Sequence, residues 1–141
     1  MIRKFINNDL TNVMKIWLKA NVNAHDFIDA QYWHDNYESV KGMLPEATIF
    51  VYEENKEILG FVGLKEHQIA GIFVDPTKQS NGIGTALLNH VKDGYSSLSL
   101  QVYKKNKRAT NFYLREGFEV IDDKVDENTH EIEYVMVWYS F

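Results

Sequence analysis

The chain of 141 residues carries a formal net charge of −5 at pH 7 and contains no cysteine. This length suits one domain, because two domains would each be left with a core of marginal size. The absence of cysteine excludes a disulfide framework, a thiolate metal site and a cysteine nucleophile. The acidic balance argues against general nucleic-acid binding, and no stretch reaches the ~20 apolar residues of a membrane span. We therefore expect a single domain, residues 1–141, in a cytoplasmic setting, with neither nucleic acid nor membrane as a partner.

The predicted elements of the first half follow one another without a linker or repeat. Residues 2–6 predict a strand, and Asp9 can cap the helix that follows. Apolar residues at helical spacing form one face of that helix: Leu10, Val13, Met14, Trp17 and Leu18. A second helix is expected at about 29–43. Two β-rich runs within residues 47–66 surround a polar turn at 53–56, which indicates a hairpin, and residues 68–74 predict a further strand.

The second half alternates helices and strands. A helix is predicted at 82–93, a strand at 97–103 and a helix at 107–116, which Gly117 ends. Two final strands, 118–122 and 133–141, surround a polar loop at 122–130. The whole order, β-α-α-β-β-β-α-β-α-β-β, predicts an α/β fold of the mixed α+β kind, with helices on the faces of a mixed sheet.

Gly82 and Gly84 open the third predicted helix after a strand and a polar loop. Neither familiar phosphate loop fits them. A triphosphate-binding loop needs a lysine after its last glycine, and a dinucleotide fingerprint needs its first glycine directly at the strand end. What remains is a run of backbone N–H groups at a helix N-terminus, which favours an anion such as a pyrophosphate. A plain flexible turn is the alternative for the glycines alone.

The segment Gln79–Gly84, Q-S-N-G-I-G, resembles the [QR]-x-x-G-x-[GA] signature of the GNAT family of N-acetyltransferases. Tyr103–Phe118 resembles the second characteristic segment of that family, and the order of predicted elements is also the family's. The resemblance implies acetyl-CoA as co-substrate and a mostly antiparallel sheet whose central strand pair splays apart. The segment Asn23–Trp33 is similar to small free-standing bacterial members whose acceptors are protein lysines or other amines.

The resemblance implies a cofactor site built largely from main chain. Phe73 and Val74 would pair with the amides of the pantetheine arm, and one of their N–H groups would polarise the thioester carbonyl. Asn106, a helix N-cap by sequence, would also contact that arm. The pyrophosphate would lie on Gln79, Ser80, Asn81, Gly82, Ile83, Gly84 and Thr85. The 3′-phosphate could meet Lys78, Lys104, Lys105, Lys107 or Arg108, and no metal site is expected.

Phe112 and Tyr113 are neighbours on a predicted helix, about 100° apart, so the two side chains cannot both face the sheet. The resemblance places the tyrosine near the cofactor sulfur, where its phenol can protonate the leaving thiolate. Packing in the core is the alternative for Tyr113. Phe118, after Gly117, is expected to seat the helix against the core.

A general base is harder to find. The strand at 68–74 offers Ala70 and Gly71 where family members often place a glutamate. Glu66, His67 and His25 are the candidates, since histidine changes charge near neutral pH. A water relay, or an acceptor that arrives neutral, would leave no signature.

Together these features predict an enzyme that transfers an acetyl group directly to a primary amine, of a small molecule or a protein lysine, in a ternary complex. No cysteine is present to carry the acyl group. The acceptor is expected to enter near His25, Asp26, Phe27, Tyr32 and Trp33. Acidic residues around that entrance favour a cationic amine: Asp26, Asp29, Asp35 and Glu38. A non-catalytic acyl-CoA-binding sensor or scaffold is the main alternative, ahead of a nucleotide-dependent oxidoreductase. The acceptor, the acyl length and the oligomeric state stay open.

Overall fold

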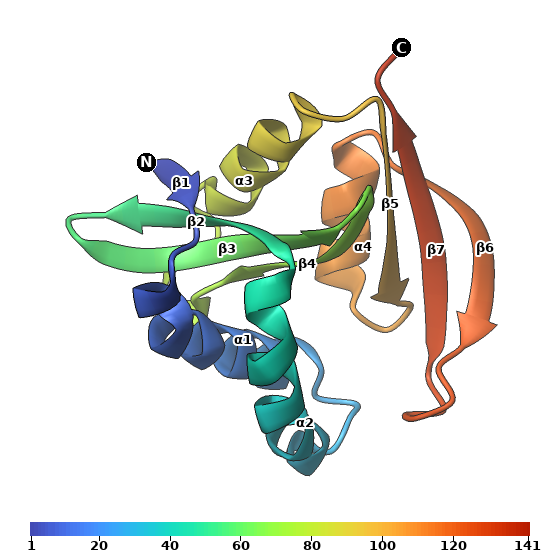
Figure 1. Cartoon of the computed structure of the whole chain (residues 1–141). Coiled ribbons are helices and arrows are strands. Elements are labelled where there is room, and N and C mark those ends of the chain that lie inside the picture. Colours follow the sequence, from blue (N-terminus) through green and yellow to red (C-terminus); the bar gives the residue numbers. More distant parts are fainter.

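A computed structural model describes the whole chain, residues 1–141 (Figure 1). Seven strands form one sheet in the order β1-β2-β3-β4-β5-β7-β6. Their bounds are β1 Ile2–Lys4, β2 Thr48–Glu54, β3 Glu57–Lys65, β4 Gln68–Val74, β5 Ser97–Tyr103, β6 Glu119–Val125 and β7 Ile132–Tyr139. All neighbouring strands are antiparallel except β4 and β5, which are parallel. The predicted mixed, mostly antiparallel sheet is confirmed.

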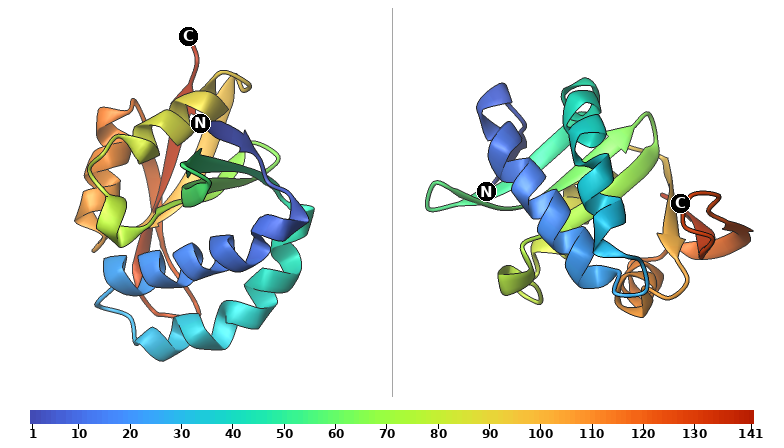
Figure 2. Two further views of the ribbon diagram at one scale, coloured as in Figure 1. Left: turned by 90° about the vertical axis from the view of Figure 1, so that its left-hand side faces the viewer. Right: turned by 90° about the horizontal axis from the view of Figure 1, so that it is seen from below.

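Four α-helices cover the two faces of this sheet: α1 Leu10–Ala24, α2 Ala30–Met43, α3 Ile83–Lys92 and α4 Lys107–Arg115. Figure 2 shows α1 and α2 together on one side, with α3 and α4 on the other. Each side has its own hydrophobic core. On β3, Val62 and Leu64 pack in the core under α3 and α4, whereas Phe61 packs in the core under α1 and α2. The strand is buried on both faces because side chains alternate along it.

The central strands β4 and β5 separate soon after they meet. Their pairing consists of Gln68 with Ser99 and Ile69 with Leu100. Beyond Ile69 the strands diverge, and in Figure 1 β2 to β4 run across the view while β5, β7 and β6 run up and down. The splayed central pair is thereby present, and it leaves one backbone edge of β4 without a strand partner.

Several predicted element ends are wrong: β1 ends at Lys4 instead of residue 6, and β7 ends at Tyr139 instead of residue 141. β6 continues to Val125, although a loop was expected from Asp122, because this edge strand is exposed throughout and tolerates polar residues. Asp9 does not cap α1 with its side chain, since a 3-10 turn at Asn7–Asp9 precedes that helix. Its carboxylate instead accepts from the Ile6 N–H at 2.9 Å and from Arg3 at 2.8 and 3.0 Å.

No helix in the structure combines the length and the hydropathy that crossing a bilayer requires.

Candidate functional site

The gap between β4 and β5 opens into two adjoining cavities. The larger, of about 700 Å³, lies between β4, α3, α4 and the end of α1. The smaller, of about 230 Å³, lies between α1, β4, β5 and β7. Seven residues line both: Asn21, His25, Ile72, Phe73, Asn106, Ala109 and Tyr113. The cavities therefore meet where β4 and β5 part.

The loop into α3 presents unpaired backbone donors to the larger cavity. None of the N–H groups from Gln79 to Thr85 has an acceptor in the protein, and the first helical bond runs from the Ala86 N–H to the Gly82 carbonyl at 3.0 Å. Gly82 has a left-handed φ of +79°, and a Cβ added there would meet nothing within 4 Å. Free donors beside open space at a helix N-terminus form a cradle for an anion.

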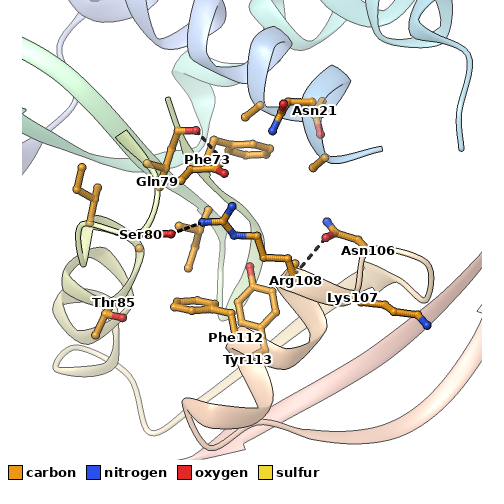
Figure 3. A pocket seen from close by; sticks show the side chains of 18 of the residues that line it. Asn21, Phe73, Gln79, Ser80, Thr85, Asn106, Lys107, Arg108, Phe112 and Tyr113 are labelled. Carbon is orange, nitrogen blue, oxygen red and sulfur yellow. Dashed lines mark hydrogen bonds between the residues drawn. The ribbon is translucent and has the colours of Figure 1, made fainter. Parts of the chain in front are cut away.

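The side chains around the larger cavity add positive charge. Four cations line it, Lys105, Lys107, Arg108 and Arg115, and no carboxylate does. Arg108 and Arg115 lie on one face of α4 because seven residues span about two helical turns. Figure 3 shows Arg108 reaching across the cavity, where its Nη2 donates to the Ser80 Oγ at 2.8 Å. This arrangement suits a phosphate-bearing ligand.

Tyr113 is both a core residue and a cavity residue. Its ring packs edge-on against Phe112 and Phe118, with centroid distances of 5.2 and 5.5 Å. Its phenol points into the larger cavity (Figure 3), where the hydroxyl has no hydrogen-bond partner in the protein. Burial raises the pKa of the Tyr113 phenol well above its ordinary value. The hydroxyl is therefore kept protonated and available as a donor.

Asn106 caps α4 and also contacts His25. Its Oδ1 accepts from the Ala109 N–H at 3.2 Å, so the predicted capping is present. That bond fixes its Nδ2 as the donor to His25 Nε2, 3.2 Å away, and the histidine must be neutral with its proton on Nδ1. Burial lowers the pKa of His25 to about 4, opposed by the Asn21 backbone carbonyl. A histidine in this state is a weak base whose Nε2 is already engaged.

Aromatic rings enclose His25 in the predicted acceptor region. The imidazole stacks on Trp33 at 5.1 Å and meets Phe27 and Tyr103 edge-on at 5.6 and 5.2 Å. His25 and Trp33 line the smaller cavity. The acidic residues expected around the entrance, Asp26, Asp29, Asp35 and Glu38, line neither cavity. Asp29 instead caps α2 by accepting from the Gln31 N–H at 2.9 Å.

Glu66 and His67 do not belong to the site. Both are exposed at the β3–β4 turn and line neither cavity. The one carboxylate that lines either of these two cavities is Glu133 on β7, which sequence reasoning missed. Strand alternation marks Glu133 as facing away from Tyr134, but the sequence does not reveal that β7 lies beside β5.

All the residues predicted to bind the cofactor line the larger cavity except Asn81, whose Nδ2 donates to the Lys78 carbonyl at 3.1 Å. Gln79 also folds back, and its Nε2 donates to the Val74 carbonyl at 3.4 Å. Lys78 and Lys104 lie outside the lining, whereas Asn21, Phe112 and Arg115 belong to it without having been expected. For Phe112 and Arg115 the helical spacing from Arg108 is the signal that could have found them.

Comparison with known proteins gives a consistent result. The sequence model described as an acetyltransferase (GNAT) domain matches residues 16–135. Peptidyl-lysine N-acetyltransferase YiaC of Escherichia coli K12 is 36% identical over 140 residues, covering 98% of this chain and 96% of the relative. Peptidyl-lysine N-acetyltransferase YjaB of the same strain is 29% identical over 120 residues, covering 84% and 82%. The solution structure of apo YjaB from E. coli has a TM-score of 0.87 at 26% identity, covering 98% of this chain and 96% of that one. The structure of yncA from Salmonella typhimurium with acetyl-CoA shares the fold, with a TM-score of 0.70 at 18% identity over 99% of this chain and 92% of that one.

Proposed function

Since this chain belongs to the GNAT family of acetyltransferases, we propose that it acts as one domain and transfers the acetyl group of acetyl-CoA to the side-chain amine of a protein lysine. Family membership confirms the predicted acetyltransferase and the predicted amine acceptor. The lysine and the roles of individual residues are the finer proposal. The use of acetyl-CoA rests on one observation above all, the row of unpaired N–H groups from Gln79 to Thr85 beside a basic cavity.

The residues present fit acetyl-CoA on the side of α3 and α4. The free N–H groups ahead of α3 and the positive end of the helix dipole bind the pyrophosphate, as the open space at Gly82 permits. Arg108 adds a planar guanidinium that can grip phosphate oxygens in pairs. Lys105, Lys107 and Arg115 neutralise the remaining charge. The cavity volume of about 700 Å³ lies within the range of cofactor sites.

The unpaired edge of β4 supports the predicted roles of Phe73 and Val74. Both residues line the larger cavity beyond the last β4–β5 pair. An extended pantetheine arm can add to that edge in the manner of a strand, through main-chain hydrogen bonds. The co-substrate supplies an acetyl group already activated as a thioester. A main-chain N–H beside its carbonyl would stabilise the oxyanion that develops during transfer.

Tyr113 is the proposed general acid. Its hydroxyl is free, protonated and directed into the cavity, where it can donate a proton to the departing sulfur. Asn106 is the proposed anchor at the junction of the two cavities, held in place by its bonds to α4 and His25.

A lysine acceptor is supported by the names of two relatives and by the shape of the site. YiaC and YjaB are described as peptidyl-lysine N-acetyltransferases. The smaller cavity holds about 230 Å³, enough for several waters at about 30 Å³ each, and therefore for an alkyl amine. The aromatic rings of Trp17, Trp33 and Tyr103 line it and suit an aliphatic chain that ends in a cation.

The test is release of the coenzyme A thiol from acetyl-CoA in the presence of four acceptor classes: lysine peptides with blocked N-termini, peptides with a free N-terminus and no lysine, polyamines and aminoglycosides. We expect turnover to be highest with the lysine peptides, and mass spectrometry to place the acetyl group on the lysine side chain. Preference for any other class contradicts the lysine proposal. Tight acetyl-CoA binding without turnover on any amine would support the non-catalytic alternative.

A further inference from the structure

The two cavities differ sharply in charge. The larger has four cationic side chains and no carboxylate in its lining, whereas the smaller has no lysine or arginine and a single carboxylate, Glu133. A site divided in this way separates an anionic ligand from a cationic one. The negative charge of the smaller cavity therefore comes from Glu133 alone.

The position of Glu133 follows from the pairing of β7 with β5. Glu133 lies opposite Tyr103 in the register of these strands. On the same strand Met136 is buried in the core under α3 and α4, and Tyr134 and Trp138 pack against that core. Strand alternation turns Glu133 to the opposite face, where the smaller cavity opens between the strands and α1.

Glu133 forms no ion pair, although Lys124 of β6 lies opposite it in the strand register. It takes part in no salt bridge and accepts no side-chain hydrogen bond. Burial raises its pKa, Asp126 raises it further, and Lys124 on β6 opposes both. The other titratable neighbours are neutral: Tyr32 of α2, Tyr103 of β5, whose hydroxyl donates to Asp126 at 2.6 Å, and His25. A half-buried carboxylate without a partner is costly in the absence of a ligand.

We propose that Glu133 receives the ammonium group of the acceptor lysine in the smaller cavity and takes one of its protons, which leaves a neutral amine to attack. This inference rests on the proposed function and assigns the general base of the acetyl transfer. His25, the alternative base that lines both cavities, is less suited because its Nε2 already accepts from Asn106. Glu66 and His67 lie outside both cavities.

The step balances without any further reagent. The lysine ammonium loses one proton to the Glu133 carboxylate, and the freed electron pair forms the new C–N bond. The C–S bond then breaks with its electrons going to sulfur, which takes the proton of Tyr113. The tyrosinate recovers a proton from the attached nitrogen, and Glu133 releases its own proton to solvent. Because an ammonium nitrogen has no lone pair, the transfer to Glu133 precedes attack, and since the pKa of a lysine is about 10.4, only a small fraction of the bound amine is neutral at any time.

The experiment compares Glu133→Gln with wild type on two peptides that differ in one side chain. One carries lysine, and the other carries an aminooxy group at the same position, which is uncharged near neutral pH and has no ammonium proton to lose. We expect kcat/KM on the lysine peptide to fall by about 10²- to 10⁴-fold. On the aminooxy peptide it should stay within several-fold of wild type, and the Kd of acetyl-CoA, measured by calorimetry, should not change.

Two variants complete the test. Glu127→Gln makes the same charge change at an exposed position in the β6–β7 loop and should leave both activities unchanged. Glu133→Asp keeps a carboxylate and should recover part of the lysine activity. Equal losses on both peptides, or no loss on either, overturn the assignment of Glu133 while leaving the acetyltransferase intact. A wild type that acetylates no lysine peptide overturns the proposed function and this inference together.

Discussion

Arg108 donates from Nη2 to the Ser80 Oγ at 2.8 Å and so joins α4 to the loop ahead of α3 across the larger cavity. Ser80 has a left-handed φ of 69°, which a residue with a side chain rarely adopts. The bond holds a guanidinium over the free N–H groups of that loop before any ligand arrives. Pre-organisation of this kind reduces the ordering cost of binding.

Arg108→Ala should therefore weaken acetyl-CoA binding. A hydrogen bond to a charged group contributes about 1.5–3 kcal/mol, so the Kd should rise by about 10- to 150-fold. Calorimetry at two salt concentrations measures it, and the variant should show a weaker salt dependence. Lys104→Ala removes the same charge from an exposed residue outside the cavity and should leave the Kd unchanged. An unaltered Kd in Arg108→Ala would contradict a role at the phosphates.

Gly84→Val should separate folding from binding. A Cβ at this position meets only Phe112, at 3.5 Å, which is an ordinary contact. Valine is at least as good a helix former as glycine, so the melting temperature of the free protein should change little. The family signature admits alanine at this position, so a branched side chain is needed to obstruct the approach of the pyrophosphate and reduce the thermal shift that acetyl-CoA produces. Gly42→Val, on α2 with open space around it, is the matched control. A full thermal shift in Gly84→Val would remove this part of the loop from the site.

Tyr113→Phe should abolish proton donation at little cost in stability. The hydroxyl has no partner within the protein, so its removal breaks no hydrogen bond, and the ring keeps its packing against Phe112 and Phe118. We expect kcat to fall by about 10²- to 10⁴-fold, with the Kd of acetyl-CoA and the melting temperature nearly unchanged. All three are measured on one preparation. A near-normal kcat in an assay limited by chemistry would leave Tyr113 with its packing role alone.

His25 should make the fold sensitive to acid. Burial lowers its pKa from 6.5 to about 4, so the unfolded chain binds more protons than the folded one between these values. The stability contribution is fully present above pH 6.5 and is lost as the pH falls toward 4, by at most about 3 kcal/mol. Denaturant titrations of wild type and His25→Gln across this range measure the difference, because other groups titrate alike in both. Parallel curves would show that His25 does not titrate in this way.

The sequence predicted the order of elements well because hydrophobic periodicity and turn residues are local signals. The bounds predicted for the strand at 68–74 and for the glycine-opened helix agree with β4 and α3 to within one residue. The errors occurred where tertiary context decides. β6 looks like a loop because an edge strand can be fully polar, and Asp9 looks like a cap until Arg3 from β1 reaches it.

The sequence predicted those residues of the candidate site that belong to the two characteristic segments. The residues from Gln79 to Thr85, and Asn106 with Tyr113, are contiguous in the chain or lie on one helix. Glu133 could not be found in this way because only the pairing of β7 with β5 brings it to the cavity. The expected acidic entrance for the acceptor failed for the same reason. Four acidic residues are close in sequence but line neither cavity: Asp26, Asp29, Asp35 and Glu38.

The brevity of the β4–β5 pairing has a mechanical consequence. Two register pairs, Gln68 with Ser99 and Ile69 with Leu100, are the only strand pairing between β1 to β4 and the group of β5, β7 and β6. A ligand that hydrogen-bonds to the free edge of β4 would fill the gap between β4 and β5 and connect the two parts of the sheet. Amide hydrogen exchange from Ala70 to Val74 should then slow when the gap is occupied, while the protected interior of β3 changes little. Binding of acetyl-CoA would then both supply the acetyl group and make the β4–β5 region more rigid.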